Sequence, residues 1–494
     1  MRIIFFLMMI FVSLTSAQTK REFRGAWVAT VANIDWPSRN NLSTEEQIRE
    51  MYVMFMKLRD SGINAVLFQV RTECDALYKS NYEPWSFHLT GKQGKEPEPF
   101  YDPLQKAVEI AHELNMELHA WFNPYRAVRV DGEYELAENH VAKLHPEWLL
   151  QFEKMKILNP GLPEVHEFIL NIMKDVLTRY DIDGIHFDDY FYPYSPKVST
   201  EDADAFAKYN RGFTNIDDWR RDNINMLMKE IYSVIKSTKP HVKFGISPFG
   251  IVKNEFVGTN GFQSYDILYC DPLSWINGKY VDYINPQLYW EMDHKTAPYS
   301  KLLPWWAEVS GERHLYIGHF SSRMAAKDYK GNKNELFDQI ELNRSTPNVD
   351  GSVFFSAKSI SMNWNGFADK LKEKYYSHIA LPPAMEWLDS IPPMPPANLT
   401  VSQSDKFVTV NWDLPELADD GELPSYYAVY RFLSDEEINV NNSSKIIYLT
   451  YPGETIFLDY LEELNEGTYF YVVTSLDRLH NESNSVLVGP VVIK

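Results

Sequence analysis

The sequence predicts an α/β fold: a (β/α)8 barrel of the TIM type, followed by a small all-β, immunoglobulin-like sandwich. Between Arg24 and Ser377, eight apolar strand-like runs alternate with amphipathic stretches, the pattern of repeated βα units. A proline cluster at Ile391–Pro396 interrupts this pattern, and short β runs separated by turn residues follow it. The 494 residues accommodate a barrel of about 250 residues or more and an appended domain.

The predicted barrel strands follow one another at the spacing of βα units. They are Gly25–Thr30, Ala65–Val70, Glu117–Phe122, Gly184–Asp188, Lys243–Ser247, Tyr283–Tyr289, His314–Gly318 and Gly351–Phe355. Helices are clearest at Thr44–Arg59, Pro103–Leu114, Pro163–Tyr180 and Asp217–Ser237, where apolar residues recur at helical spacing. Ser43 suits a helix N-cap and Pro163 a first helical turn. Long loops after strands two, three and four predict a substrate cleft on their side of the barrel.

Four segments divide the chain: a signal peptide at 1–17, the barrel at 22–380, a proline-rich linker at 381–396 and the sandwich at 397–494. The predicted sandwich strands are Leu399–Trp412, Ser425–Phe432, Lys445–Tyr448, Thr455–Tyr460, Gly467–Ser475 and Ser485–Ile493. Trp412 in an early strand and the segment Leu464–Tyr471 resemble a fibronectin type III module, in which a tyrosine near the start of the penultimate strand forms a corner.

The first 17 residues predict export. Arg2 precedes an apolar stretch that is too short to span a bilayer, and the small residues Thr15 and Ala17 precede a cleavage site before Gln18. No later apolar run reaches transmembrane length. We therefore expect a periplasmic or extracellular protein without a membrane span.

Net charge, cysteine count and aromatic content indicate which ligands and which kind of fold stabilisation this chain can have. A formal net charge of −20 repels phosphate backbones, which disfavours nucleic acid. Two cysteines, Cys74 and Cys270, exclude a disulfide scaffold, although they leave open one bridge or two buried thiols. Aromatic residues make up 14% of the chain, an enrichment that suits a carbohydrate-binding protein.

The most informative motif is GIHFDDYFYP at residues 184–193. An apolar strand ends there in two adjacent carboxylates, Asp188 and Asp189, and catalytic groups of (β/α)8 enzymes lie at such strand ends. Because side chains alternate along a strand, Asp188 shares the inward face with His186, whereas Asp189 points the other way unless the strand has ended. Carboxylates flanked by aromatic rings are suited to glycosidic bonds and pyranose faces.

Polar and aromatic residues also gather at the ends of the other predicted strands. Singly, Asn123, Asn285 and His186 are equally well explained as hydrogen-bonded core groups, but the whole set favours a binding face. The predicted substrate-binding residues are Asp35, Trp36, Gln69, Arg71, Tyr78, Trp121, Asn123, Arg126, His186, Asp189, Tyr190, Gln287, Tyr289, Trp290 and Glu291.

Two carboxyl groups are normally needed to hydrolyse a glycosidic bond. Asp188 and Glu73 are the predicted catalytic pair, with Glu291 as a reserve acid. Glu73 follows strand two in an aromatic-containing loop, where partial desolvation would raise its pKa, as a general acid requires. Arg71 could instead neutralise Glu73 in a salt bridge.

No cofactor or metal ion is predicted. His186, Asp188 and Asp189 could hold a divalent ion, but the closely spaced histidine pair of polysaccharide deacetylases is missing. No glycine-rich phosphate loop appears at a strand-to-helix turn, and there is no Gly-x-Ser-x-Gly elbow. Nucleotide chemistry and the usual serine hydrolases are therefore disfavoured.

Seven blocks of sequence between residues 22 and 375 together resemble the YngK-like glycosyl-hydrolase-like family 10. They are RGAWVATVANIDWP, GINAVLFQVRTECDALY, ELHAWFNPYR, DGIHFDDYFYP, FGISPFG, DYINPQLYW and LYIGHF. The resemblance implies a secreted bacterial (β/α)8 glycoside hydrolase acting on peptidoglycan strands that lack stem peptides. It also implies a catalytic acidic residue at Glu73 and places Asp188 in the other signature block.

Segment Asp183–Asp188 also resembles the strand-four signature of family 18 chitinases, with Tyr190 where those enzymes have an acidic glutamate. That likeness implies that Asp188 orients an acetamido group of the substrate and does not attack the sugar. Alternative functions are hydrolysis of another dietary or host polysaccharide, glycan binding without catalysis, and metal-dependent deacetylation. The sandwich is predicted to be a spacer, or a module that docks on protein or cell wall, so that truncation after Ala380 should leave turnover nearly unchanged.

Overall fold

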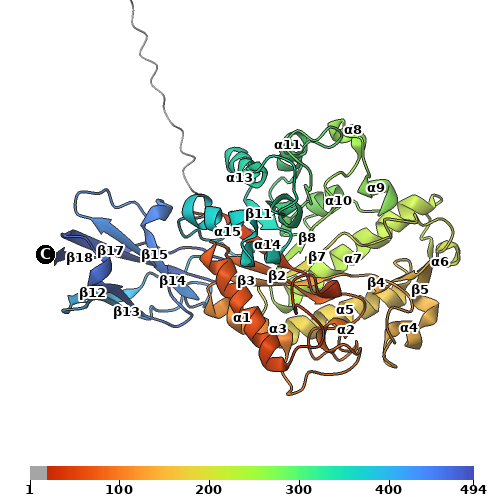
Figure 1. Ribbon diagram of the computed structural model, residues 1–494, viewed down its shortest axis with the longest axis horizontal. Coiled ribbons are helices and arrows are strands. Elements are labelled where there is room, and N and C mark those ends of the chain that lie inside the picture. The colour runs from red at the N-terminus through yellow and green to blue at the C-terminus, as the bar shows by residue number, and fades with distance from the viewer. Residues whose placement is uncertain (1–18) are drawn as a thin grey trace, which may run out of the picture.

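Eight parallel strands close into a barrel, and a β-sandwich is attached to one end of it (Figure 1). The computed structural model describes residues 19–494, so the signal peptide predicted at 1–17 lies outside the described residues. Around the barrel, neighbouring strands are β1 (Phe23–Val28), β11 (Gly351–Phe354), β10 (His314–His319), β9 (Tyr283–Ile284), β8 (Lys243–Ile246), β7 (Gly184–Phe187), β3 (Glu117–Phe122) and β2 (Ala65–Arg71). The predicted fold class is confirmed.

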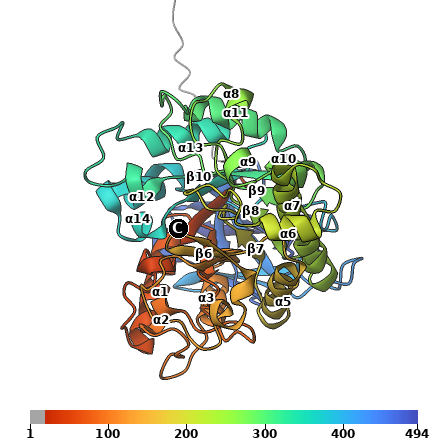
Figure 2. The same ribbon diagram turned by 90° about the vertical axis from the view of Figure 1, so that its right-hand side faces the viewer.

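Helices surround the barrel on its outer side (Figure 2). The main ones are α1 (Thr44–Asp60), α3 (Pro103–Glu113), α5 (Pro163–Arg179), α7 (Ile216–Thr238), α10 (Pro272–Asn277), α11 (Tyr299–Val309), α13 (Glu335–Ser345), α14 (Ala357–Ser361) and α15 (Phe367–Lys370). Ser43 caps α1 through a reciprocal pair of hydrogen bonds with Glu46, and Pro163 opens α5, as predicted. None of the helices within residues 19–494 has the length and apolar character needed to cross a bilayer.

The long loops at the carboxyl ends of the barrel strands carry small elements of their own. These are α2 (Phe87–Thr90), β4 (Arg126–Val128), α4 (Val141–Leu144), β5 (Leu149–Phe152), β6 (Met155–Leu158), α6 (Ala203–Tyr209), α8 (Asn254–Val257), α9 (Ser264–Ile267) and α12 (Ser321–Met324). Strands β4, β6 and β5 form an antiparallel sheet within the loop after β3. This loop side of the barrel is the predicted catalytic face.

Strand β9 is much shorter than predicted. The sequence favours a strand over Tyr283–Tyr289, but β9 ends at Ile284, and only isolated bridges at Gln287 continue toward Phe249 and Gly318. Pro286 explains the difference, because it has no N–H to donate to the ladder and its carbonyl accepts from the Gly318 N–H instead.

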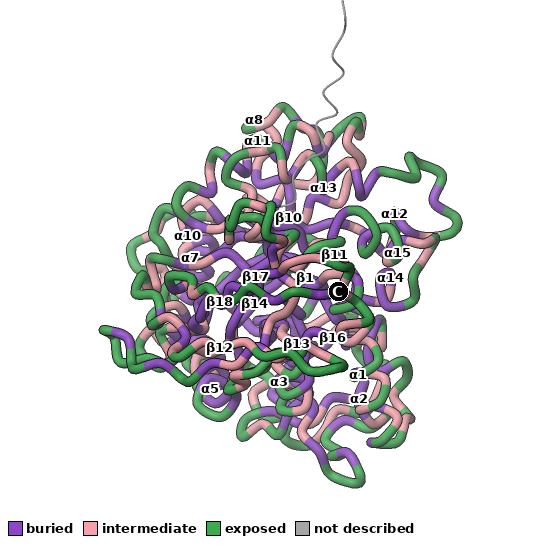
Figure 3. The backbone as a smooth tube through the Cα atoms, turned by 90° about the vertical axis from the view of Figure 1, so that its left-hand side faces the viewer, coloured by how far each residue is buried: buried purple, intermediate pink, exposed green. Residues whose placement is uncertain are grey.

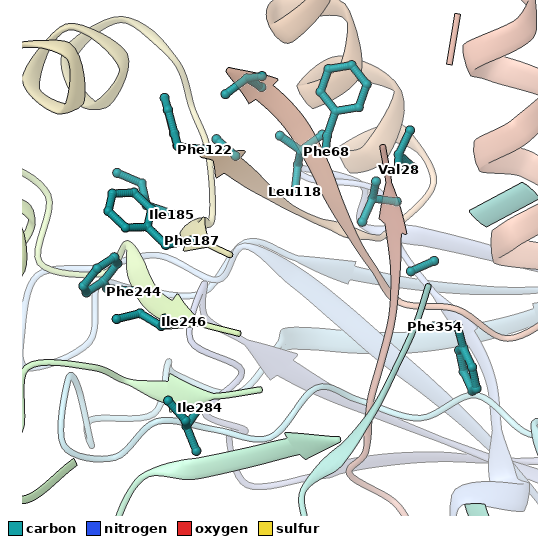
Figure 4. Packing of buried hydrophobic residues seen from close by; sticks show 14 of the residues in the cluster. Val28, Phe68, Leu118, Phe122, Ile185, Phe187, Phe244, Ile246, Ile284 and Phe354 are labelled. Atoms are coloured by element: carbon teal, nitrogen blue, oxygen red, sulfur yellow. The ribbon is translucent and has the colours of Figure 1, made fainter. Parts of the chain in front are cut away.

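Two apolar layers hold the barrel together. Outward-facing residues such as Phe68, Phe122 and Phe187 pack against the helices (Figure 4). A second cluster fills the barrel interior, where Phe23 and Tyr316 stack with their ring centroids 4.0 Å apart. Both cysteines lie in the outer layer as buried free thiols.

A chain of polar side chains also runs through the barrel interior; we call Trp27, His186, Tyr283, His119 and Glu117 the polar column. Trp27 Nε1 donates to His186 Nε2 at 3.0 Å, and His186 Nδ1 lies 3.1 Å from the Tyr283 hydroxyl. Tyr283 in turn lies 2.8 Å from His119 Nδ1, and His119 Nε2 lies 2.8 Å from Glu117 Oε2. His186 Nε2 accepts from Trp27, so the proton of the His186 ring is on Nδ1, which donates to the Tyr283 hydroxyl. Tyr283 then donates to His119 Nδ1, and His119 Nε2 donates to Glu117, so every group in the column has a partner.

Two glycines in the strands make room for this column. A Cβ atom on Gly184 would lie 2.4 Å from His119 Nδ1, and one on Gly245 would lie 1.9 Å from Tyr283 Cζ. Any larger residue at either position would displace a ring from the barrel interior.

The C-terminal residues form two antiparallel sheets. One contains β12 (Ala397–Gln403), β13 (Phe407–Asp413) and β16 (Ile456–Tyr460); the other contains β15 (Ile446–Leu449), β14 (Tyr426–Leu433), β17 (Gly467–Leu476) and β18 (Val486–Ile493). The run predicted as one strand over Leu399–Trp412 is a hairpin, because Ser404 Oγ accepts from the N–H groups of Lys406 and Phe407 and turns the chain.

The sandwich packs against the barrel end opposite the loops (Figure 1). Strands β14 and β17 are buried on both faces, whereas β12 and β16 carry many exposed positions (Figure 3). Glu117, at the lower end of the polar column, contacts Lys243 Nζ and also His480 of the sandwich through Oε1. Arg478 reaches Asp181 at 2.6 Å and Asp183 at 3.2 Å. Buried and half-buried charges therefore join the two domains.

The segment Leu381–Leu388, which begins the predicted linker, closes the base of the barrel; we call it the barrel-base segment. Leu381 and Met385 are fully buried, and Met385 belongs to the interior cluster. Trp387 donates from Nε1 to Asp282 Oδ1 at 3.1 Å and lies against His314 with ring centroids 4.7 Å apart. Truncation after Ala380 would remove all of these contacts, so we expect it to lower stability, and unchanged turnover after this truncation stays a prediction.

We expect a chain that ends at Ala380 to unfold at a lower temperature than one that ends at Pro396. Both lack the sandwich, but only the longer chain keeps Leu381, Met385 and Trp387, and losing a large buried apolar side chain costs about 2–5 kcal/mol. Thermal unfolding followed by circular dichroism compares the two. Equal stability would contradict a structural role for the barrel-base segment. The chain that ends at Pro396 should keep its turnover, because the catalytic face lies at the other end of the barrel.

Candidate active site

Asp188 lies directly after β7, on the loop side of the barrel. Trp121 Nε1 donates to its Oδ2 at 3.0 Å, and Asn123 Nδ2 lies 3.3 Å from both carboxylate oxygens. Burial raises the pKa of Asp188 to about 6, although the charge of Arg126 and these donors favour the ionised form. The predicted inward orientation agrees with these contacts, since Trp121 belongs to the interior cluster.

Asp189 occupies a different environment beside it. Strand β7 ends at Phe187, so strand alternation no longer sets the direction of Asp189. Its Oδ2 accepts from the Tyr194 hydroxyl, whereas its buried Oδ1 has no hydrogen-bond partner in the described part of the chain. Burial raises its pKa to about 7; Tyr194 and Gln287 oppose the shift and the charge of Asp188 adds to it.

Glu73 is held as a carboxylate by the loop after β3. Its Oε2 accepts from the Arg129 backbone N–H at 2.8 Å and from the Tyr134 hydroxyl at 3.2 Å. Its Oε1 lies 3.4 Å from Arg129 Nε and 3.6 Å from His88 Nε2. Burial alone would raise the pKa of Glu73, but His88, Arg126 and the Arg129 backbone outweigh it and lower the pKa to about 2. The expected raised pKa is therefore wrong.

Arg71 does not neutralise Glu73. Its guanidinium makes a double contact with Glu83, with Nε–Oε2 and Nη2–Oε1 distances of 2.9 and 2.7 Å, and both side chains are buried. Arg71 also donates to the carbonyl of Pro124 at 3.0 Å. Arg71 thus ties the loop after β2 to the end of β3 and lies beneath the site.

Arg126 connects the surroundings of Glu73 and Asp188. Its backbone N–H donates to Asn123 Oδ1 at 2.9 Å, and its Nε donates to the Thr72 carbonyl at 3.1 Å. Its positive charge lowers the pKa of Glu73 and opposes the rise at Asp188. The guanidinium also lies 5.0 Å from the ring centroid of Tyr190, which is 41% exposed. Tyr190 is thus an open aromatic face beside buried charges.

Several predicted substrate-binding residues lie in the protein interior. Trp36 packs beneath α1 and donates to the Gln47 carbonyl at 2.9 Å, while Tyr78 is fully buried in the outer layer. His186 belongs to the polar column and has no exposed surface. These positions make Trp36, Tyr78 and His186 structural residues, which corrects their predicted role.

Asp35 and Gln69 support the loops of the site. Asp35 accepts from the Ser356 hydroxyl at 2.7 Å and from the Ala29 N–H at 2.8 Å, which joins the loops after β1 and β11. Burial raises the pKa of Asp35 to about 6. Gln69 Oε1 accepts from the Val31 N–H at 3.0 Å. Both residues position backbone beneath the catalytic face.

The residues predicted after the sixth strand divide into two groups. Gln287 donates to the Ser247 carbonyl at 3.1 Å, and Tyr289 stacks on Phe320 with centroids 4.9 Å apart. The charges of Asp189 and Asp188 contribute to the raised pKa of Tyr289, after burial, so its hydroxyl belongs to the same site. Glu291 instead accepts from the Tyr329 hydroxyl at 3.3 Å and lines a separate hollow with Glu335.

An aromatic cluster beside Asp189 was not predicted. The Tyr194 ring stacks on Phe262 at 4.9 Å, and Phe249 packs against both Phe262 and Trp290 at 5.0 and 5.4 Å. Of these, Trp290 alone was predicted. Tyr194 closes the YFYPY run and Phe249 lies in the FGISPFG block, so the sequence contained a signal for both, whereas Phe262 comes from a loop with no recognisable motif. His88, Arg129 and Tyr134, the partners of Glu73, were missed for the same reason.

Metal-ligating geometry occurs elsewhere. Among residues 19–494, the one group of three carboxylates that could hold an ion is Asp389, Asp420 and Glu422, on the linker and the sandwich. The carboxylates of the predicted catalytic face are not part of this group; within the described residues they contact protein hydrogen-bond donors and lie near aromatic rings.

Comparisons with known proteins identify the family. Residues 22–333 match the family described as Glycosyl hydrolase-like 10. The glycosyl hydrolase YngK of Bacillus subtilis (strain 168) is 40% identical over 499 residues, covering 96% of this chain and 94% of that protein. The glycosyl hydrolase DigH of Escherichia coli (strain K12) is 34% identical over 371 residues, covering 69% of this chain and 84% of that protein.

Among solved structures, the PgaB glycoside hydrolase domain of Bordetella bronchiseptica aligns with a TM-score of 0.46 and 12% identity, covering 72% of this chain and 99% of that one. The catalytic domain of β-amylase from Paenibacillus polymyxa aligns with a TM-score of 0.47 and 9% identity, covering 73% and 99%. The family match and the identity to YngK along nearly the whole chain place this protein in the glycosyl hydrolase-like 10 family.

Proposed function

We propose that this glycoside hydrolase is exported and cleaves bonds between N-acetylated sugars, with peptide-free peptidoglycan glycan strands as its substrate. The observation that carries the proposal is a pair of adjacent buried carboxyl groups, Asp188 and Asp189, at a barrel strand end lined by aromatic rings. Proteins that only bind sugars do not need carboxyl groups with raised pKa values at this position. The family resemblance supports the choice of glycan.

Asp188 and Glu73 are the catalytic residues of this proposal. Trp121 and Asn123 fix both oxygens of Asp188, which suits a carboxylate that attacks the anomeric carbon or stabilises positive charge developing there. Glu73 is ionised near neutral pH because its pKa is lowered to about 2, so it acts as an anion and not as a proton donor. Arg126 keeps the two negative charges compatible within one site.

Tyr190 and the aromatic cluster beside Asp189 form the sugar-binding surface. Tyr190 is partly exposed, and its ring lies 5.4 Å from that of Tyr194. Flat apolar rings of this kind pack on the faces of pyranose units. Arg126, Gln287, Tyr289 and Trp290 surround the same region and provide further contacts. The site therefore suits an acetylated sugar chain.

Incubation with purified glycans tests the substrate directly. We expect soluble fragments from denuded sacculi and far less product from intact sacculi, since stem peptides would obstruct the loops around the site. Chromatography with mass spectrometry identifies the products. Absence of fragments from denuded sacculi and chitin oligomers alike would refute the proposal. Fragments from plant or host polysaccharides alone would favour the alternative substrate.

Two further measurements separate the alternative functions. Calorimetric binding of glycan without product after long incubation would identify a glycan-binding protein. Released acetate, lost when a chelator is added, would identify a deacetylase. An N-terminus at Gln18 in the mature protein would establish export.

The sandwich acts as a docking or spacing module in this proposal, related to fibronectin type III domains. The Tyr469 hydroxyl donates to the Asn465 carbonyl at 3.0 Å, a contact of the kind that a tyrosine corner makes, which supports this relationship. Its aromatic residues Trp412, Tyr469 and Tyr471 are buried between the sheets and not available to a sugar. Protein or cell wall is the partner that we propose for its outer surface.

A further inference from the structure

The ionised state of Glu73 leaves the reaction without an identified proton donor. Both of its oxygens face positive or hydrogen-bonding groups, among them the guanidinium of Arg129 at 3.4 Å and the Arg129 N–H at 2.8 Å. Protonating Glu73 would break this arrangement. Cleavage of a glycosidic bond between unactivated sugars nevertheless requires a proton on the leaving oxygen.

Glu73 and Asp189 each have one buried carboxyl oxygen without a hydrogen-bond partner among the described residues, but their charged surroundings differ. Glu73 Oε1 lies 3.4 Å from Arg129 and 3.6 Å from His88, whereas Asp189 makes no salt bridge within residues 19–494. Tyr194 holds one of its oxygens, Oδ2, while Oδ1 is buried without a partner among the described residues. Asp189 follows Asp188 directly, and the charge of Asp188 contributes to the raised pKa of Asp189, so the two carboxyl groups influence each other electrostatically. Asp189 is only 1% exposed, and a buried polar atom normally has a hydrogen-bond partner. If Oδ1 carries a proton, it can form that hydrogen bond by donating to a bound ligand.

The groups around Asp189 favour its protonated form. Asp188 is the adjacent charge, and the hydroxyls of Tyr190, Tyr194 and Tyr289 and the thiol of Cys270 are neutral neighbours whose pKa values are raised. Arg126, the nearby cation, acts on Asp188 and Glu73. Burial raises the pKa of both carboxyl groups, the charge of Asp188 raises that of Asp189 further, and the charge of Arg126 opposes the rise at Asp188, so Asp189 is the member of the pair that is favoured to hold a proton.

We propose that Asp189 is the general acid of the reaction and that its Oδ1–H protonates the leaving glycosidic oxygen. The assignment rests on the hydrolase function proposed above. The proton passes to the glycosidic oxygen while its bond to the anomeric carbon breaks, and the bonding electron pair leaves with that oxygen. Water later bonds to the anomeric carbon and gives up one proton, which restores Asp189. Tyr194 is a positioning residue that holds Oδ2 and so orients Oδ1.

Substrates with different leaving groups test this assignment. The probes are N-acetylglucosamine oligomers with a reducing-end aryl group, ranging from unsubstituted phenol to dinitrophenol. We expect Asp189→Asn to lose about 10²–10⁴-fold in rate with the phenyl substrate, the usual contribution of general acid catalysis. It should lose little with the dinitrophenyl substrate, since dinitrophenolate departs without a proton. Glu73→Gln should lose activity with both.

The pH profile provides a readout that a structural defect would not reproduce. Wild-type kcat/KM should fall below about pH 6 and above about pH 7, as Asp188 gains a proton and Asp189 loses one. The alkaline fall should be absent in Asp189→Asn with the dinitrophenyl substrate. Tyr194→Phe removes a donor that stabilises ionised Asp189, so the alkaline fall should move to higher pH. Asp204→Asn, at an exposed position on α6, should match the wild type.

The outcomes separate the assignment from the function. An active wild type, combined with an Asp189→Asn variant of normal rate and normal pH profile, would overturn the assignment and leave the hydrolase function intact. Leaving-group rescue in Glu73→Gln in place of Asp189→Asn would return the acid role to Glu73. A folded wild type that cleaves no glycan and no aryl glycoside would refute both proposals. If Asp189→Asn fails to fold, the shift in Tyr194→Phe decides.

Discussion

Replacing Asp188 by asparagine is expected to reduce kcat/KM on denuded glycan by about 10³-fold or more, at the upper part of the range for a catalytic group. Asparagine preserves the size of the side chain but has no negative charge to offer the anomeric carbon. Its amide would also place an N–H₂ group against the donors of Trp121 and Asn123, which now hold the carboxylate at 3.0 and 3.3 Å. Steady-state kinetics and calorimetric binding should show lost turnover with retained glycan affinity.

Two further variants provide a control and an intermediate case for Asp188→Asn. Glu291→Gln should keep most of the activity, because Glu291 contacts Tyr329 and lies in a separate hollow. Trp121→Phe removes one donor to Asp188 and retains an aromatic ring, so we expect a loss of intermediate size. Near-normal activity of a folded Asp188→Asn variant would remove Asp188 from the mechanism.

Glu117→Gln is expected to lower the free energy of unfolding by about 3–5 kcal/mol, the usual cost of removing one partner from a buried ion pair. Lys243, which is only 1% exposed, would lose its counter-charge, and the new amide N–H₂ group would face a nitrogen of His119 or His480 that now contacts a carboxylate oxygen. Chemical denaturation of the intact chain measures the change. Glu113→Gln, an exposed position at the end of α3, is the matched control and should leave stability nearly unchanged.

The same substitution should alter the dependence of stability on pH. The pKa of Glu117 in the folded protein is well below its ordinary value of 4.5, and burial lowers the pKa of His480. Because the pKa values of Glu117 and His480 are lower in the folded protein than in the unfolded chain, the unfolded chain binds protons at a higher pH. The free energy of unfolding therefore falls as the pH drops. The wild type should therefore lose stability more steeply than Glu117→Gln between about pH 5 and pH 3. Parallel curves would contradict this role for Glu117.

Local sequence was sufficient for most of the barrel. Seven of the eight strands lie within two residues of their predicted limits, because apolar runs and helical spacing record which residues face the core. The error at β9 has a local cause in Pro286. The undivided strand at Leu399–Trp412 was also wrong for a local reason, since Ser404 forms a turn that apolar spacing does not reveal.

The site was less predictable, because its chemistry depends on loops from distant parts of the chain. Strand alternation correctly placed Asp188 inward. The charge state of Glu73 depends on Arg129, Tyr134 and His88, which approach it through folded loops and not through sequence proximity. Trp36 and Tyr78 are the same residue types that bind sugars, and only packing determines that they are buried.

The polar column has a consequence for how the barrel selects a single arrangement of its strands. An apolar interior tolerates a strand that slips along its neighbours, since one aliphatic side chain substitutes for another. Here a slip of β3 by one residue would turn His119 and Glu117 outward, which would leave buried Lys243 without its counter-charge and the Tyr283 hydroxyl without the acceptor of its proton. A slip by two residues would break the same one-way order of donors. The column therefore selects the correct strand register. A barrel with misaligned strands would bury unpaired charge, whereas the correctly aligned barrel pairs the charges of the column.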